Sequence, residues 1–137
     1  MIQKDILIIE DDINDIDLFT ELLTSCNITN PINALMSNSD VESYMENHVL
    51  DNKPIIIFLD LHLPTVNGLS ILKKLRANQT FDEVPIVILS GTDNESEIIE
   101  TMRFKANSFA RKPLTVADVF KLIKEFNIGV FLTDMQN

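Results

Sequence analysis

The sequence predicts an α/β domain in which five parallel strands form one open sheet with helices packed on both faces. Two patterns support this fold class. Apolar runs of strand length alternate five times with stretches whose apolar residues recur every three or four positions, the spacing of a helix. The strand-length runs are almost entirely Ile, Val and Leu, which is typical of strands buried on both faces. The length, 137 residues, suits a single domain.

The predicted strands are short and differ in strength. The clearest is Ile-Ile-Ile-Phe-Leu at 55–59, and the weakest is Asn-Ala-Leu-Met at 33–36. In chain order, the five segments are 6–9, 33–36, 55–59, 85–89 and 108–110.

Each strand is followed by one predicted helix, which is recognised by a single apolar face. Ser39 is the expected N-cap of the second helix, and the fourth helix is expected to start after Asn94. In chain order, the apolar faces are Ile13, Ile16, Phe19, Leu22, Leu23 and Cys26; Val41, Tyr44, Met45 and Val49; Leu69, Ile71, Leu72 and Leu75; Ile98, Ile99 and Met102; and Val116, Val119, Phe120, Ile123 and Phe126.

Right-handed crossovers between parallel strands turn five strand-helix units into an open, doubly wound sheet. For five strands the natural order is 2-1-3-4-5, the flavodoxin-like (βα)5 arrangement. This domain is expected to occupy residues 1–127. Residues 128–137 form a short tail with an apolar stretch at 129–132, which we expect either to extend the last helix or to make a dimer contact.

Composition narrows the classes of function. The chain has 21 acidic and 11 basic residues and a net charge of −10, so nucleic acid and anionic membrane surfaces would repel it. No apolar run approaches the roughly 20 residues that span a bilayer, and the first residues do not resemble a signal peptide. We therefore expect a cytoplasmic protein that binds neither DNA nor membranes. Its single cysteine, Cys26, allows no internal disulfide.

Residues that can carry chemistry stand where the predicted strands end. The first strand is followed by Glu10 and Asp11, the third by Asp60 and the fourth by Ser90, and the fifth leads into Lys112. In open α/β sheets, functional groups gather beyond the carboxyl ends of the strands, near the point where the strand order reverses. The fold therefore brings carboxylates, a hydroxyl and an amine to one edge of the sheet.

Such a group of acids needs a positive partner. Two unit charges about 4 Å apart repel by roughly 4 kcal/mol at an effective dielectric of 20. Mg²⁺ binds through one or two carboxylates, waters and phosphate oxygens, and Lys112 can add a second positive charge and hold a phosphoryl oxygen. The pattern favours attack of the Asp60 carboxylate on phosphorus, with Mg²⁺ neutralising charge on the transferred group.

Four motifs resemble those of response-regulator receiver domains, and the likeness covers roughly residues 4–127. They are Ile-Leu-Ile-Ile-Glu-Asp at 6–11, Phe-Leu-Asp-Leu-His-Leu-Pro at 58–64 with Gly68, Ile-Leu-Ser-Gly-Thr at 88–92, and Ala-Asn-Ser-Phe-Ala-Arg-Lys-Pro at 106–113. Ser90 lies 30 positions and Lys112 lies 52 positions after Asp60, which is similar to the family's usual separations. Among these CheY-like proteins, the chain looks most like stand-alone receivers associated with bacterial phytochromes.

The resemblance implies that Asp60 is the phosphoacceptor of a two-component system, phosphorylated by a sensor histidine kinase or a phosphotransfer protein. It implies that Mg²⁺ is held by Glu10, Asp11, Asp60 and the backbone carbonyl of His62, with Asp11 the more direct ligand and Glu10 acting through water. The protein would be a signalling phosphoacceptor rather than an enzyme, although we expect it to catalyse its own phosphorylation from small phosphodonors and its own dephosphorylation.

The resemblance also assigns a switch. Ser90 corresponds to the switch hydroxyl, Lys112 to the phosphate-binding lysine and Phe109 to the aromatic switch position. Pro113 is similar to a proline that follows a cis peptide bond in the family. Phosphorylation would then change the surface of the fourth helix, fifth strand and fifth helix, which binds a downstream protein, and would affect homodimer formation.

Three positions depart from the family pattern or add to it. Lys105 stands where the family usually has Gly, which leaves the geometry of that turn open. Asp12 is a third consecutive acid and is expected to cap the first helix. His62 is interpreted as a residue at the rim of the pocket rather than a phosphorelay histidine.

Two alternative functions remain open. A phosphoaspartyl hydrolase of the dehalogenase type also uses an Asp after a strand, but it would want a second Asp at the position of His62. A pseudo-receiver would share the fold without being phosphorylated.

Overall fold

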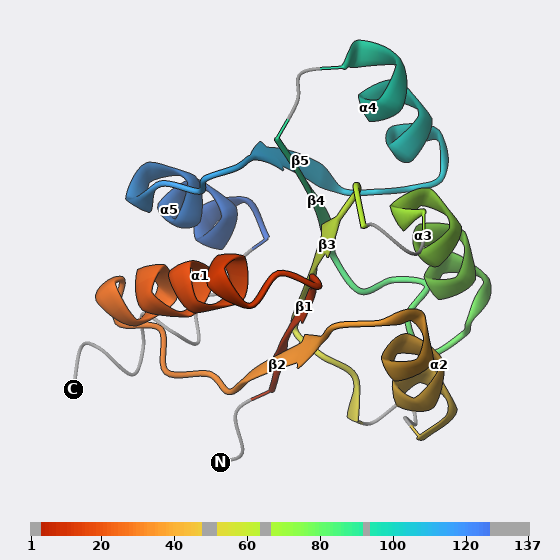
Figure 1. The fold of residues 1–137 in the computed structure, drawn as a ribbon, viewed down its shortest axis with the longest axis horizontal. Coiled ribbons are helices and arrows are strands. Elements are labelled where there is room, and N and C mark those ends of the chain that lie inside the picture. Colours follow the sequence, from red (N-terminus) through yellow and green to blue (C-terminus); the bar gives the residue numbers. More distant parts are fainter. Residues whose placement is uncertain (1–3, 48–51, 64–66, 92–93, 127–137) are drawn as a thin grey trace.

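The computed structural model describes residues 4–47, 52–63, 67–91 and 94–126, and its five parallel strands form one sheet in the order β2-β1-β3-β4-β5 (Figure 1). The predicted flavodoxin-like order is therefore confirmed. In chain order, the elements are β1 Ile6–Ile9, α1 Ile13–Ser25, β2 Ile32–Leu35, α2 Asn38–Asn47, β3 Ile56–Asp60, α3 Gly68–Ala77, β4 Ile86–Ser90, α4 Glu95–Arg103, β5 Ser108–Arg111 and α5 Val116–Glu125.

The strand β1 lies at the point where the chain order reverses. Its first residue, Ile6, is in register with Ile32 of β2 on one side and with Ile56 of β3 on the other. Because all neighbouring strands are parallel, their carboxyl ends lie at one edge of the sheet. The residues that follow β1, β3, β4 and β5 therefore share that edge.

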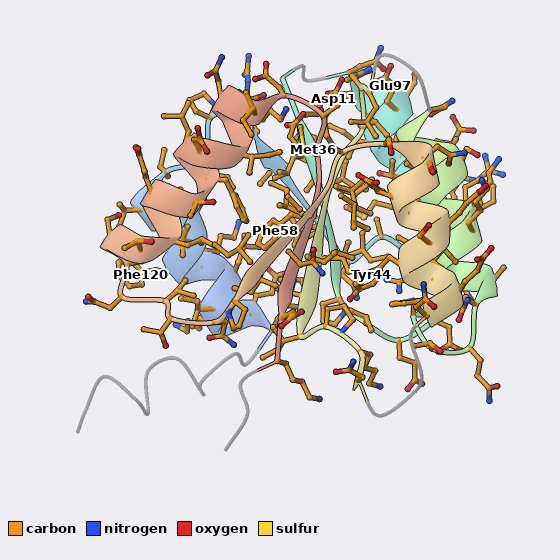
Figure 2. All side chains as sticks on the ribbon, turned by 60° about the horizontal axis from the view of Figure 1, so that its bottom comes forward. Asp11, Met36, Tyr44, Phe58, Glu97 and Phe120 are labelled. Carbon is orange, nitrogen blue, oxygen red and sulfur yellow. The ribbon has the colours of Figure 1, made fainter. Side chains whose placement is uncertain are left out.

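Helices cover both faces of the sheet, with α1 and α5 on one side and α2, α3 and α4 on the other (Figure 1). Successive residues of β1 point to opposite faces, so Ile6 and Ile8 belong to the core under α1 and α5, and Leu7 and Ile9 to the core under α2 and α3. In Figure 2, Phe58 lies toward α1 and α5, where its ring meets that of Phe19 edge-on with 4.8 Å between centroids. Nearly continuous apolar strands thus form two cores, as the sequence pattern indicated.

Two of the expected helix caps are confirmed. The Asp12 carboxylate accepts a hydrogen bond from Asn14 N at 2.8 Å and begins α1, and the Asn94 side chain accepts one from Glu97 N at 3.2 Å and begins α4. Each side chain satisfies an N–H group that has no partner within the helix.

The expected cap of α2 was wrong by two positions. The helix begins at Asn38, so Ser39 lies inside it, and Ser37 Oγ accepts the hydrogen bond from Asp40 N at 3.0 Å. Asp40 Oδ2 in turn accepts a hydrogen bond from Met36 N at 3.0 Å. Ser37 therefore caps the helix, and the Asp40 side chain holds the N–H of Met36, the residue before the cap.

α4 is attached more lightly than the other helices. Within this helix only Thr101 is buried, and Ile99 and Met102 are exposed. By contrast, α3 buries Ile71, Leu72 and Leu75 among its residues. α4 therefore has little apolar surface anchoring it to the sheet.

The predicted tail, residues 128–137, lies outside the described residues, as does Val49 of the second predicted helical face. The helix extension and the dimer contact assigned to the tail stay predictions. No described helix combines the length and the apolar character that crossing a membrane requires.

Candidate functional site

Three carboxylates meet at the carboxyl edge of the sheet. Glu10 and Asp11 follow β1, and Asp60 is the last residue of β3. One oxygen from each of the three side chains lies within 4.8 Å of the other two. Figure 2 shows Asp11 at this edge. The structure therefore brings these residues together, as the strand order predicted.

Glu10 is the most enclosed of the three, with only 1% of the residue exposed. Its Oε2 accepts hydrogen bonds from the backbone N–H groups of Asp11 at 3.1 Å and Asp12 at 3.3 Å, so the turn into α1 orients the carboxylate. Burial raises the pKa of Glu10 to about 7; a hydrogen bond from Lys112 opposes the shift, and neighbouring Asp60 adds to it.

Lys112 approaches the acids from the end of β5. Its backbone N–H donates to Ser90 O at 2.8 Å, which ties the segment after β5 to the end of β4. The Lys112–Pro113 peptide bond is cis, as the family resemblance implied.

The Lys112 ammonium lies among three carboxylates. Its Nζ donates to Glu10 Oε1, to Asp15 Oδ2 at 3.0 Å and to Asp60 Oδ2 at 3.1 Å. Burial alone would lower the pKa of Lys112, but the hydrogen bonds to Glu10 and Asp15 and the charge of Asp60 raise it above its usual value. The ammonium is therefore charged near neutral pH and is the positive charge that the acids required.

Asp60 is held at both oxygens. Oδ2 accepts from Lys112, and Oδ1 accepts from the backbone N–H of His62 at 3.0 Å. The chain then doubles back, since Gly68 N donates to Leu61 O at 3.2 Å. An Asp at the end of a buried strand is thus fixed by the loop that follows it.

Ser90 and Phe109 lie on adjacent strands beside this cluster. Ser90 ends β4 and is 1% exposed. Phe109 is half-buried in β5, pairs in register with Ile88 of β4, and packs against the core under α2 and α3. Ser90 thus lies at the end of the strand next to Asp60, and Phe109 lies one strand further from it.

The donor set fits a hard divalent cation. Glu10 and Asp60 are buried, Asp11 is partly buried, and a single ion could contact an oxygen of each. Carboxylate oxygens are the ligands that Mg²⁺ and Mn²⁺ prefer. Lys112 contacts Glu10, Asp15 and Asp60, and Asp11 lies beside two of these acids, so a further positive charge would reduce the repulsion among the four.

The geometry agrees with a comparison with known protein families. The family model described as the response regulator receiver domain matches residues 6–124. The chain is a response regulator receiver domain. Receiver domains are modules of two-component signalling, and the family inferred from the four sequence motifs is confirmed.

Phytochrome response regulators are among the proteins that resemble this chain. Response regulator Rcp1 of Synechocystis sp. is 26% identical over 124 residues, which are 88% of this chain and 84% of Rcp1. The solved bacteriophytochrome response regulator RtBRR has a TM-score of 0.78 and 26% identity, covering 91% of this chain and 78% of that chain. The Mn²⁺-bound form of Rcp1 has a TM-score of 0.71 and 25% identity, covering 89% and 90%. The predicted likeness to phytochrome response regulators is thus confirmed.

Two residues at the receiver site were missed from the sequence. Asp15 binds Lys112, and Glu97 Oε2 lies 2.9 Å from His62 Nε2 at the rim of the site. Both acids lie in the first turn of a helix that follows a strand of the site. Such a position returns a side chain to the carboxyl edge of the sheet, and it is the sequence signal that could have identified them.

Proposed function

We propose that this receiver domain accepts a phosphoryl group on the carboxylate of Asp60. The observation that carries the proposal is the environment of Asp60, whose side chain is 7% exposed. Lys112 donates a hydrogen bond to one oxygen of this carboxylate, and the backbone N–H of His62 donates to the other. A carboxylate oxygen of Glu10 and one of Asp11 lie within 4.8 Å of an Asp60 oxygen. A carboxylate held in this way is aimed at an incoming phosphorus atom.

The phosphodonor is the phosphohistidine of a sensor kinase or phosphotransfer protein, or a small donor such as acetyl phosphate. An Asp60 oxygen forms a bond to phosphorus while the bond from phosphorus to the donor's leaving group breaks. The leaving group is the imidazole of the phosphohistidine, which takes a proton from solvent, or acetate when the donor is acetyl phosphate. The acyl phosphate on Asp60 is later hydrolysed by water, which restores the carboxylate and releases phosphate. The domain promotes both steps on itself and is a phosphoacceptor rather than an enzyme with a separate substrate.

Glu10, Asp11, Asp60 and the backbone carbonyl of His62 would hold Mg²⁺. The ion supplies charge neutralisation for the transferred group. The oxygen-only cluster and the Mn²⁺-bound form of the relative Rcp1 support this assignment. Lys112, which donates to Oδ2 of Asp60, adds a second positive charge.

The proposed output is a change in a protein-binding surface. A phosphoryl group brings about −1.5 to −2 charges and three acceptor oxygens. The Ser90 hydroxyl bonds one of these oxygens, and the half-buried Phe109 on the neighbouring strand turns inward. The surface of α4, β5 and α5, which includes exposed Ile99 and Phe120, then favours a different partner.

The test is labelling by acetyl phosphate in the presence of Mg²⁺, followed by intact-mass measurement. We expect the wild-type protein to gain one phosphoryl group and Asp60→Asn to gain none, because the amide lacks the nucleophilic oxygen anion. Omitting Mg²⁺ should abolish labelling of the wild type as well. Equal labelling of Asp60→Asn would refute the assignment, and a wild type that binds no Mg²⁺ would favour the pseudo-receiver.

A further inference from the structure

Asp15 has a contact that the proposed phosphorylation chemistry does not use. It lies in the first turn of α1, where its backbone N–H donates to the capping carboxylate of Asp12 at 3.4 Å. Its own Oδ2 accepts from Lys112 Nζ at 3.0 Å, across 97 positions of sequence. Asp15 on α1 therefore binds the same lysine that is expected to hold the phosphoryl group.

The hydrogen-bonding capacity of Lys112 is fully used in this arrangement. A lysine ammonium has three N–H donors and no acceptor. Glu10, Asp15 and Asp60 each accept from it. Before Lys112 can bond additional phosphoryl oxygens, at least one of these carboxylates must release it.

The three carboxylates differ in how easily each could release Lys112. The side chain of Glu10 is 1% exposed, and its second oxygen is held by backbone N–H groups, whereas that of Asp60 is 7% exposed. The Asp15 side chain is 40% exposed, so water can replace the ammonium as its partner. Releasing a buried carboxylate costs far more free energy than releasing one that regains its hydration.

The space around this contact also allows movement. Asp15 and Lys112 both line a cavity of about 220 Å³ between α1 and the segment after β5, with Leu18 and Leu114 among its other walls. The cavity therefore leaves space beside the Asp15 side chain into which its carboxylate can turn.

We propose that Asp15 is a positioning residue that holds Lys112 in the unphosphorylated state and releases it when a phosphoryl group reaches Asp60. This inference rests on the proposed phosphorylation of Asp60. Asp15 acts through Lys112 and does not touch the reacting atoms. Because its bond exists before transfer and is given up afterwards, it stabilises the resting state and opposes phosphorylation.

The test compares two variants that remove the same charge from α1. Asp15→Asn removes the negative charge that attracts Lys112, and Asp17→Asn, an exposed position two residues further on, is the matched control. With acetyl phosphate and Mg²⁺, Asp15→Asn should be phosphorylated on the order of two- to fivefold faster than wild type, the range expected for loss of a partly exposed ion pair. Asp17→Asn should match wild type, and Asp15→Glu, which restores the charge, should return the rate toward it.

A second readout reports on Lys112 directly. In ¹⁵N-detected spectra of the metal-free protein, the Lys112 ammonium signal should be visible in wild type and in Asp17→Asn. In Asp15→Asn it should broaden through faster hydrogen exchange. Unchanged melting temperatures would show that neither variant acts through loss of folding.

The outcomes separate this inference from the function on which it rests. Phosphorylation of wild type with no acceleration in Asp15→Asn would refute the role of Asp15 alone. Equal acceleration in Asp17→Asn would show that only the charge of α1 matters and would also refute it. Absence of labelling in wild type would overturn the phosphorylation of Asp60 and the inference together.

Discussion

At the scale of single residues, Gly68 determines how closely the chain can return to Asp60. A Cβ atom at this position would lie 2.7 Å from Asp60 O, 2.7 Å from Leu61 Cα and 2.8 Å from Leu61 O. All three are backbone atoms of the segment that orients the Asp60 carboxylate, so they cannot yield as a flexible side chain would. Gly68 is required because it has no side chain, and not because of an unusual backbone conformation. Among the described residues, no glycine has a positive φ.

Gly68→Ala is therefore expected to disturb both stability and the site. The added methyl group should lower the free energy of unfolding by about 1–3 kcal/mol, the usual cost of overpacking, and should weaken Mg²⁺ binding because the Asp60 backbone must shift. Urea denaturation and Mg²⁺ titration measure the two effects.

Gly91→Ala provides the control beside the same pocket. Within the part of the chain that the structure describes, no atom beyond its immediate neighbours in sequence lies within 4 Å of the position that its Cβ would take. We expect stability within about 0.5 kcal/mol of wild type for this variant. Equal losses in the two variants would contradict the explanation based on close approach.

At the scale of elements, Arg76 joins α3 to two loops on the side of the sheet opposite α1. Its Nη1 donates to Phe81 O and Val84 O, both at 2.8 Å, and its Nε donates to Lys105 O at 3.0 Å. Nη2 donates to Asn107 Oδ1 at 2.7 Å. One guanidinium thus fixes the entry to β4 and the turn before β5.

This clamp also accounts for the turn that the sequence left open. Lys105 has φ of 69°, a left-handed conformation that usually favours Gly. Its carbonyl is bonded by Arg76, and the N–H of Ala106 donates to Thr101 O at 3.0 Å. The turn forms without Gly because the surrounding hydrogen bonds fix its geometry.

Arg76→Lys should show how much the clamp contributes. Lysine keeps the charge but lacks the planar fork, so buried carbonyls lose their donors. We expect the free energy of unfolding to fall by about 1–3 kcal/mol, measured by urea denaturation. Arg103→Lys, at an exposed arginine of α4, is the control and should change stability by less than about 0.5 kcal/mol. A similar small change in Arg76→Lys would contradict the structural role of the guanidinium.

At the scale of the whole molecule, stability and cation binding are linked through Glu10. Its pKa is about 7 in the folded protein, above the ordinary value of 4.5. Between these values the folded state binds more protons than the unfolded state, so the metal-free protein loses stability as pH rises through this window. A cation that binds ionised Glu10 must displace a proton below pH 7, so binding strengthens over the same range.

Mg²⁺ should therefore protect the protein against heat more at pH 8 than at pH 6. With a pKa of about 7, protonation of Glu10 reduces the apparent Mg²⁺ affinity about tenfold between the two values. The rise in melting temperature at a fixed Mg²⁺ concentration measures the effect. Glu10→Gln should bind Mg²⁺ weakly at both values, and a pH dependence that survives in this variant would rule out Glu10 as its source.

The sequence predicted the molecule best where local pattern and strand order decide the outcome. Continuous apolar runs identified the strands, and strand ends located Glu10, Asp60 and Lys112. Contacts that depend on how the helices and strands pack could not be predicted from the sequence. The bond of Asp15 depends on how α1 lies beside the segment after β5, and the acceptors of Arg76 are backbone atoms with no signature in the sequence.

The light attachment of α4 has a consequence for how such proteins diversify. Because Thr101 is the one residue that this helix buries, most of its positions can change without cost to either core. New specificity can arise on the outside of α4 while the acids and lysine at the sheet edge stay as they are. One ancestral regulator can in this way be rewired to many targets through substitutions that folding does not oppose.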